Sequence, residues 1–226
     1  MSAAQHPAEV SLAEIVEGFR SVTTPSVADA VDRLLHRPAF MSHEIKPVAS
    51  GKLVGPAVTV LEGPALEAKP PQHALDAIDT APPGSVLTIG TVDPTSARNV
   101  ACLGGLMVTA AVVRGLAGAV LDGGVRDVEE IRQLGLPVFA RSVVPATTVG
   151  RYATLARDLP VPCGGVLVRP GDILVGDTDG VVVVPREHAS QVLAVALEIE
   201  EAERRMAARI RELGSIRRAL EELGRI

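Results

Sequence analysis

Hydrophobic residues recur at helical spacing near both ends of the chain. Residues 11–14 form a capping box, Ser-x-x-Glu, and the apolar stripe that follows it predicts a first helix. Thr24-Pro25 supplies a cap and a proline for the first turn of a second helix, whose apolar stripe extends to Leu34. A longer stripe, from about Glu187 to Leu213, predicts a long C-terminal helix.

The segment between these helices alternates between strand-like and helix-like patterns. Runs rich in Val, Ile and Leu predict strands at residues 54–61, 85–89, 117–122 and 137–140. Helices are expected at 75–81, 105–114 and 127–135, and irregular structure at 38–50 and 91–103. Strands that alternate with helices in this rhythm form parallel sheets, so the pattern predicts a parallel βαβαβ core with right-handed crossovers.

The pattern changes after residue 160. Three short strands are predicted at 164–168, 172–175 and 180–184, and turn-forming sequences rich in Gly and Asp separate them. Strands with such close turns pair antiparallel, so this region is predicted to be an antiparallel meander. We interpret residues 1–226 as a single α/β domain in which residues 1–10 form a loose tail.

Composition narrows both the fold and the function. Hydrophobic residues make up 47% of the chain but aromatic residues only 2%, so Val, Leu, Ile and Ala must build the core. That composition is typical of an α/β protein with buried strands. The net charge is −5, and the basic residues are interleaved with acids, which argues against a nucleic-acid-binding surface.

The sequence favours a cytoplasmic protein. Cys102 and Cys163 lack metal-type spacing and do not make a disulfide scaffold. The N-terminus lacks a basic stretch followed by an apolar run, and the apolar runs elsewhere are too short to span a membrane. We therefore expect a reducing compartment and no membrane partner.

Arg126 and Asp127 stand side by side after the strand predicted at 117–122. Parallel sheets bind their ligands beyond the carboxyl ends of the strands. An arginine can hold a small carboxylate in a planar fork, and an aspartate can bind a hard ion such as Mg²⁺. The pair therefore suggests a site for a small anionic substrate on a metal. The alternative is that Asp127 only caps a helix, in a capping box with Glu130, and that Arg126 is a surface residue.

A glycine pair leads into the neighbouring helix. Gly104 and Gly105 precede Leu106 and Met107 at the point where that helix is predicted to begin. Free N–H groups and a partial positive charge at a helix N-terminus would suit a pyruvate-like carboxylate or an enolate oxygen. The alternative is that both glycines only permit close packing.

Other recognisable chemistry is absent from the sequence. There is no G-x-G-x-x-G between a strand and a helix, no phosphate-binding G-x-x-x-x-G-K-[ST], and no nucleophile elbow. Asp172, Asp177 and Asp179 are explained by turn chemistry, because a calcium loop needs denser ligands. The glutamates at 198–203 are interpreted as a solvated helix face, one of which could reach the site of a neighbouring subunit.

Six segments follow the order found in one known family: 55–59 (GPAVT), 104–106 (GGL), 114–118 (RGLAG), 122–127 (DGGVRD), 137–140 (PVFA) and 170–185 (PGDILVGDTDGVVVVP). Together they resemble the 4-hydroxy-4-methyl-2-oxoglutarate aldolase family, which shares its fold with the regulator of ribonuclease activity A. The resemblance covers roughly residues 20–213, far more than a single short motif.

The resemblance implies a swivelling-domain-type α/β/β fold and homotrimers, often stacked as hexamers, with sites between subunits. It also implies a Mg²⁺- or Mn²⁺-dependent lyase that cleaves a 4-hydroxy-2-oxo acid to pyruvate and decarboxylates oxaloacetate as a side activity. Arg126 would hold the carboxylate of this small 2-oxo acid, Asp127 would bind the metal, and the N–H groups of Leu106 and Met107 would meet the pyruvyl end. Glu203 would reach the site from a neighbouring chain.

One position departs from the family pattern. Family aldolases usually carry an acid at the position of Gly105, where it contacts metal-bound water. Solvent or another carboxylate must fill that vacancy here, with Glu203 as the first candidate.

The alternative function is a non-catalytic regulator that binds protein, but that branch tends to lose the aspartate found here as Asp127. A methyltransferase, the name that some relatives carry, would need a glycine-rich cofactor loop that this chain lacks.

Overall fold

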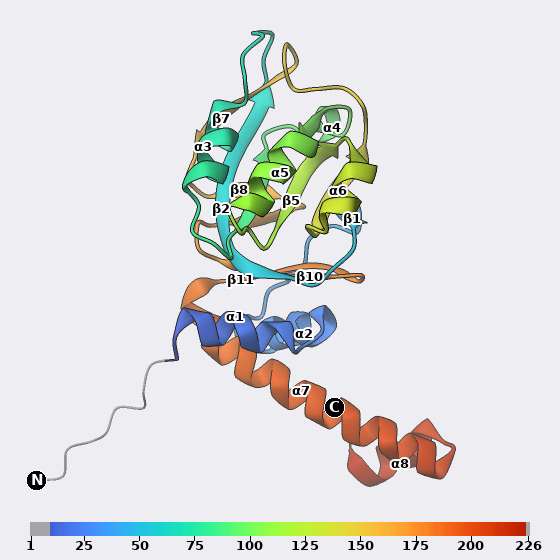
Figure 1. The fold of residues 1–226 in the computed structure, drawn as a ribbon. Coiled ribbons are helices and arrows are strands. Elements are labelled where there is room, and N and C mark those ends of the chain that lie inside the picture. Colours follow the sequence, from blue (N-terminus) through green and yellow to red (C-terminus); the bar gives the residue numbers. More distant parts are fainter. Residues whose placement is uncertain (1–9, 225–226) are drawn as a thin grey trace, which may run out of the picture.

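The computed structural model describes residues 10–224, which form a mixed sheet with helices packed around it (Figure 1). The tail expected over residues 1–10 lies outside the described residues, apart from Val10. The helices are α1 (Leu12–Arg20), α2 (Thr24–Leu35), α3 (Gln72–Thr80), α4 (Pro94–Ala97), α5 (Gly105–Val113), α6 (Val128–Leu134), the 3₁₀ helix η1 (Arg186–His188), α7 (Ala189–Leu213) and α8 (Ile216–Leu223). The strands are β1 (Lys46–Ala49), β2 (Leu53–Pro64), β3 (Val86–Thr91), β4 (Ala101–Leu103), β5 (Gly118–Val125), β6 (Val138–Val143), β7 (Tyr152–Arg157), β8 (Val161–Cys163), β9 (Val166–Val168), β10 (Ile173–Asp177) and β11 (Gly180–Val184).

Strand β2 organises the sheet because it pairs with three strands along its length. Leu53–Pro56 pair antiparallel with β10, Ala57–Glu62 pair parallel with β3, and Val60–Pro64 pair antiparallel with β7. The nine-stranded sheet has the order β1-β6-β5-β3-β2-β10-β11, with β4 beside β5 and β7 beside β2. Strands β2, β3, β5 and β6 run parallel, which confirms the predicted parallel core.

Several short strands were not predicted from the sequence. The region 38–50, expected to be irregular, contains β1, and the expected loop at 91–103 contains α4 and β4. Strands β7 and β8 were also missed, and β9 pairs with β8 in a separate two-stranded sheet. The predicted three-stranded meander is therefore wrong for its first strand, while β10 and β11 pair antiparallel as expected. Strands β1, β4, β8 and β9 have only three or four residues. Strands β1, β4 and β7 pair with segments far from them in the chain, which local periodicity does not reveal.

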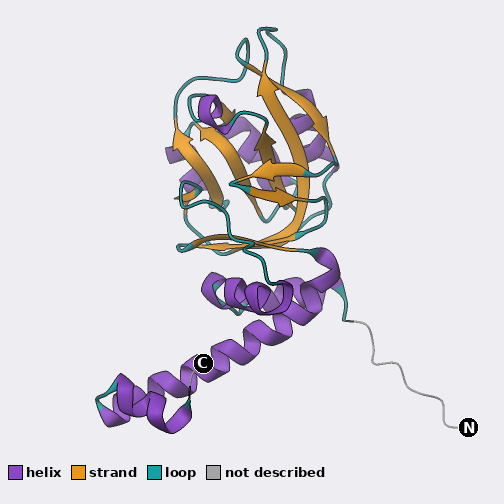
Figure 2. Ribbon diagram, turned by 180° about the vertical axis from the view of Figure 1, so that it is seen from behind, coloured by secondary structure: helices purple, strands orange, loops and turns teal. Residues whose placement is uncertain are grey.

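The two faces of the sheet are covered differently. Helices α3, α5 and α6 cover one face, where Ile78, Val108 and Ile131 pack into a core with the strands. The β8–β9 pair lies on the opposite face, which is turned toward the viewer in Figure 2. A Cβ on Gly90 of β3 would lie 2.3 Å from the carbonyl oxygen of Pro162, so glycine lets β8 pack directly on β3.

Strands β10 and β11 separate two hydrophobic cores. Ile173 and Val175 face α1, α2 and α7, while Leu174 between them faces the core under β8 and β9. Successive side chains of a strand point to opposite faces, so one apolar strand serves both cores. In Figure 1 the three helices lie beneath this pair of strands, at one end of the molecule.

The N-terminal helices follow the predicted pattern with one change of cap. Ser11 and Glu14 form the expected capping box of α1. Thr23, and not Thr24, caps α2, because the Thr24 hydroxyl instead donates to Asp177 Oδ1 at 2.5 Å. This hydrogen bond ties α2 to the end of β10 and supports the interpretation of Asp177 as a structural residue.

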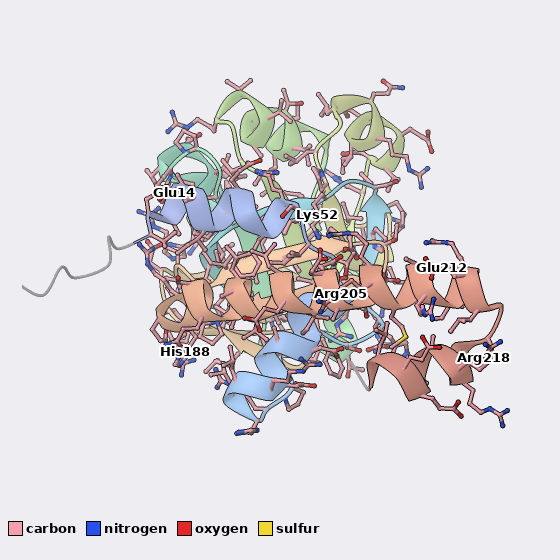
Figure 3. All side chains as sticks on the ribbon, turned by 90° about the horizontal axis from the view of Figure 1, so that it is seen from below. Glu14, Lys52, His188, Arg205, Glu212 and Arg218 are labelled. Carbon is pink, nitrogen blue, oxygen red and sulfur yellow. The ribbon has the colours of Figure 1, made fainter. Side chains whose placement is uncertain are left out.

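Helix α7 confirms the predicted long C-terminal helix and extends beyond the rest of the molecule (Figure 1). Its first half is buried against the body through residues such as Val192 and Ile199. Figure 3 shows Arg205 and Glu212 on the second half, where α8 folds back alongside α7. Within residues 10–224, none of the helices combines the length and the apolar character that a bilayer crossing requires.

Candidate functional site

A cleft of about 610 Å³ lies at the carboxyl end of β5. The segments 68–71 and 147–149 line it, together with the first turns of α5 and α6. In Figure 1 this is the end of the sheet toward which the arrow of β2 points. The cleft brings together six residues that were predicted from the sequence: Gly104, Gly105, Leu106, Met107, Arg126 and Asp127.

Asp127 caps a helix, but the helix is α5 and not its own helix α6. Its backbone is left-handed, with φ 60° and ψ 37°, and its side chain makes no capping hydrogen bond to α6. Its Oδ2 instead accepts a hydrogen bond from the Gly105 N–H at 2.9 Å. The predicted capping box with Glu130 is therefore wrong, because the left-handed backbone turns the carboxylate toward the neighbouring helix. The side chain is 45% exposed, so a carboxylate oxygen remains available to the cleft.

Arg126 lies against the same glycine turn. Its N–H donates to the Leu103 carbonyl at 3.1 Å, and its Nε lies 3.6 Å from Asp127 Oδ2. A Cβ on Gly104 would stand 2.9 Å from Asp127 Oδ2 and 3.0 Å from Arg126 Nε. Gly104 therefore permits close packing and also shapes the cleft, because its missing side chain leaves room for the two charged groups.

Within residues 10–224, the first turn of α5 presents two backbone N–H groups without hydrogen-bond partners. The Gly105 N–H donates to Asp127, and the Val108 N–H donates to the Gly104 carbonyl at 3.1 Å. Among the described residues, the N–H groups of Leu106 and Met107 have no hydrogen-bond partner. Both lie where the helix dipole is positive, so this turn can accept a carboxylate or an enolate oxygen.

Glu130 is a residue of the cleft that the sequence analysis missed. It stands in the first turn of α6 and lines the cleft, and its carboxylate lies over Gly105. Its spacing of three residues from Asp127 was the available signal, because residues i and i+3 of a helix lie on the same side. The sequence analysis assigned that spacing to a capping box.

Glu203 is not brought to the cleft within one chain. It is exposed on α7. Helix α7 lies at the end of the molecule opposite the end toward which the arrow of β2 points (Figure 1). Among the described residues of one chain, the structure therefore assigns the space over Gly105 to Glu130 and not to Glu203.

The cleft carboxylates fit a hydrated hard cation. Within residues 10–224, no three His, Cys, Asp or Glu side chains gather as a metal-binding group. Asp127 and Glu130 nevertheless both offer carboxylate oxygens to the cleft, over the two glycines whose missing side chains make room for them. Mg²⁺ commonly keeps several waters and takes only one or two carboxylates from the protein. The donor set therefore suits Mg²⁺ or Mn²⁺ better than a closed zinc-type site.

A buried carboxyl group lies behind the cleft. Glu62 of β2 is fully buried, and among the described residues neither of its carboxyl oxygens has a hydrogen-bond partner. Burial raises the pKa of Glu62 to about 7, against a smaller opposing effect of the Cys102 thiol. Cys102 itself lines the cleft, and burial together with the charge of Glu62 raises its pKa. The sequence analysis did not single out Glu62.

Two of the aspartates after residue 170 accept backbone hydrogen bonds at turns, which supports the predicted turn chemistry for them. Asp172 accepts hydrogen bonds from the N–H groups of Arg169 and Arg186, and Asp177 accepts one from the N–H group of Asp179.

Comparisons with known proteins agree with this architecture. A family model described as RraA-like, Aldolase/RraA, matches residues 24–183. A protein of Halalkalibacterium halodurans, provisionally named a 4-hydroxy-4-methyl-2-oxoglutarate aldolase, is 35% identical over 196 residues, which are 83% of this chain and 85% of that protein.

Two solved structures share the fold. An uncharacterized protein from Pseudomonas syringae pv. tomato has a TM-score of 0.81 and 28% identity, with 92% of this chain and 96% of that chain covered. Streptomyces coelicolor RraAS2, described as an unusual member of the RNase ES inhibitor RraA family, has a TM-score of 0.78 and 29% identity, with 88% and 98% covered. On the match to its family model and to these relatives, the chain belongs to the RraA-like aldolase family.

Proposed function

We propose that this protein is a divalent-metal-dependent lyase, a class II pyruvate aldolase. Its substrate would be 4-hydroxy-4-methyl-2-oxoglutarate or a related 4-hydroxy-2-oxo acid, and oxaloacetate decarboxylation would be a side activity. The observation that carries the proposal is the pair of unpartnered N–H groups of Leu106 and Met107 in a cleft that also holds Arg126 and Asp127. A small dianionic oxo acid matches these groups, because its oxygens need both donors and positive charge.

Each residue of the cleft has a separate part in this proposal. Arg126 binds a substrate carboxylate through its planar guanidinium. The N–H groups of Leu106 and Met107 receive the oxygens of the pyruvyl end, where negative charge develops during cleavage. Asp127 would hold the cation through the oxygen that Gly105 does not use. A bound Mg²⁺ or Mn²⁺ supplies a Lewis acid that polarises the 2-oxo group and stabilises the enolate charge.

The activity is expected to depend on a divalent cation. Protein treated with a chelator should lose pyruvate release from a panel of 4-hydroxy-2-oxo acids and from oxaloacetate. Added Mg²⁺ or Mn²⁺ should restore it, because the charge of the enolate needs a Lewis acid. A coupled assay for pyruvate measures both steps, and turnover that is indifferent to the chelator would contradict the metal requirement.

Replacement of Arg126 by Lys is expected to weaken substrate binding more than turnover. An ammonium cannot reproduce the two parallel hydrogen bonds of a guanidinium, so KM should rise about tenfold, a loss of about 1.4 kcal/mol, with a smaller change in kcat. Arg132→Lys on α6 is the matched control, since Arg132 contacts Glu129 and the Val48 carbonyl and does not line the cleft. Equal KM values for both variants and the wild type would remove Arg126 from the site.

The protein is expected to be a homotrimer or a hexamer, with Glu203 of one chain facing the cleft of the next. Two features support this: α7, which carries Glu203, lies at the end of the molecule away from the end toward which the arrow of β2 points, and α7 extends beyond the body (Figure 1). Head-to-tail contacts of this kind close into rings. Light scattering should give a mass of three or six chains, and a monomeric mass would count against a shared site.

A non-catalytic regulator that binds another protein is the second candidate, which the similarity to RraAS2 favours. The two candidates separate in the pyruvate assay. A regulator would show no cation-dependent turnover of any oxo acid in the panel. Asp127, held in place by Gly105 beside two free N–H groups, supports the enzyme.

A further inference from the structure

The carboxylate of Glu130 occupies the space that a side chain at position 105 would fill. A Cβ built on Gly105 would lie 2.1 Å from Glu130 Oε2 and 2.9 Å from Glu130 Oε1. Gly105 is not among the residues with positive φ, and it forms the first residue of α5. The absence of a side chain, and not an unusual backbone, is therefore what this position supplies.

Glu130 differs from its neighbour Glu129 in what it contacts. Glu129 forms an ion pair with Arg132 at 2.9 Å and is 84% exposed, whereas among the described residues Glu130 has no ion-pair or hydrogen-bond partner. Glu130 instead lines the cleft with Asp127, so two carboxylates face the same space. Like charges in one cleft repel each other unless a cation lies between them. Arg126, whose Nε lies 3.6 Å from Asp127 Oδ2, and the N-terminus of α5 compensate part of this charge, while Glu130 has no paired cation among the described residues.

We propose that Glu130 is the second carboxylate of the cation site, and that Gly105 makes room for it. This inference rests on the proposed function, because Asp127 is the first carboxylate of that site. The carboxylate of Glu130, which α6 carries, thereby takes the place of the side chain that position 105 of α5 lacks. In this arrangement Asp127, which precedes α6, and Glu130 of its first turn would hold the cation beside the N-terminus of α5.

The test measures binding of Mn²⁺ alone to the purified full-length protein, by the electron paramagnetic resonance signal of the free ion. Glu130→Gln should weaken the affinity by about tenfold or more, the usual effect of losing a supporting carboxylate near a metal. Glu129→Gln, one residue away, should leave it unchanged. Asp127→Asn should abolish binding.

A compensating variant separates a site role from a structural one. In the Glu130→Ala background, Gly105→Asp should recover most of the lost Mn²⁺ affinity, because the space over position 105 is then free for a new carboxylate. In the wild-type background the same substitution must first displace the flexible end of Glu130, so it should tighten binding little. Melting temperatures of all variants identify any that fail to fold.

Different results would overturn different claims. If the wild type does not bind Mn²⁺, or if Asp127→Asn binds it normally, the proposed function fails. If Asp127→Asn abolishes binding while Glu130→Gln behaves like Glu129→Gln, only the role of Glu130 is wrong. Loss in Glu130→Ala that Gly105→Asp does not recover would also count against Glu130 as a cation ligand.

Discussion

Replacement of Asp127 by Asn is expected to reduce cation-dependent pyruvate release at least about 100-fold and to leave the protein folded. The loss follows from the missing negative charge, because a neutral amide binds Mg²⁺ or Mn²⁺ far more weakly than a carboxylate. The fold should survive because an Asn oxygen can still accept the Gly105 N–H. Asn also tolerates the left-handed backbone at φ 60° better than most residues.

Asp158 offers a matched control for this experiment. It too has a left-handed backbone, with φ 58°, but it pairs with Arg157 at 3.4 Å and does not line the cleft. Asp158→Asn should therefore keep wild-type kinetics and a wild-type melting temperature. The steady-state kinetics and thermal melts of both variants check the prediction. If Asp127→Asn retained wild-type turnover while folded, the cation would be held elsewhere or not at all.

Ionisation of Glu62 is expected to cost the protein about 3 kcal/mol of stability as the pH rises. Burial without a hydrogen-bond partner raises its pKa from 4.5 to about 7 in the folded state. A shift of this size corresponds to about 3 kcal/mol. Below pH 4.5 the carboxyl group is protonated in both states, so the stability is fully present. Between 4.5 and about 7 only the unfolded state releases the proton, so the stability falls with rising pH.

The variant Glu62→Gln isolates this contribution because glutamine has a similar shape and does not ionise. The free energy of unfolding of the wild type, measured by urea denaturation and compared with that of Glu62→Gln, should decline relative to the variant from pH 5 to pH 8. Glu17→Gln, at an exposed position on α1, controls for the removal of any glutamate charge. If the difference in the free energy of unfolding between the wild type and Glu62→Gln stayed constant with pH, Glu62 would not be buried as a neutral acid.

The hydrophobic pattern of the sequence determined most of the core fold. Buried Val-rich strands alternating with helices require both faces of the sheet to be covered, and β2, β3, β5 and β6 are parallel as predicted. The long stripe of α7 likewise predicted its helix. Such segments are recognisable because their periodicity reflects burial along many consecutive residues. The strands β1, β4 and β8 escaped prediction because they have only three or four residues. Strand β7 escaped because its partly exposed side chains do not alternate and its partner β2 lies far away in the chain.

For the candidate site too, the sequence predicted some features and only the tertiary structure showed the others. The sequence placed Arg126 and Asp127 beyond the carboxyl end of a predicted strand, where parallel sheets bind ligands, and Gly104 at the start of the neighbouring helix. The cleft brings these residues together. Only the tertiary structure showed that Asp127 caps α5 and that Glu130 lies over Gly105. It also showed that Glu62 is buried without a partner. These features depend on a left-handed backbone and on contacts between segments far apart in the chain, and local sequence patterns encode neither.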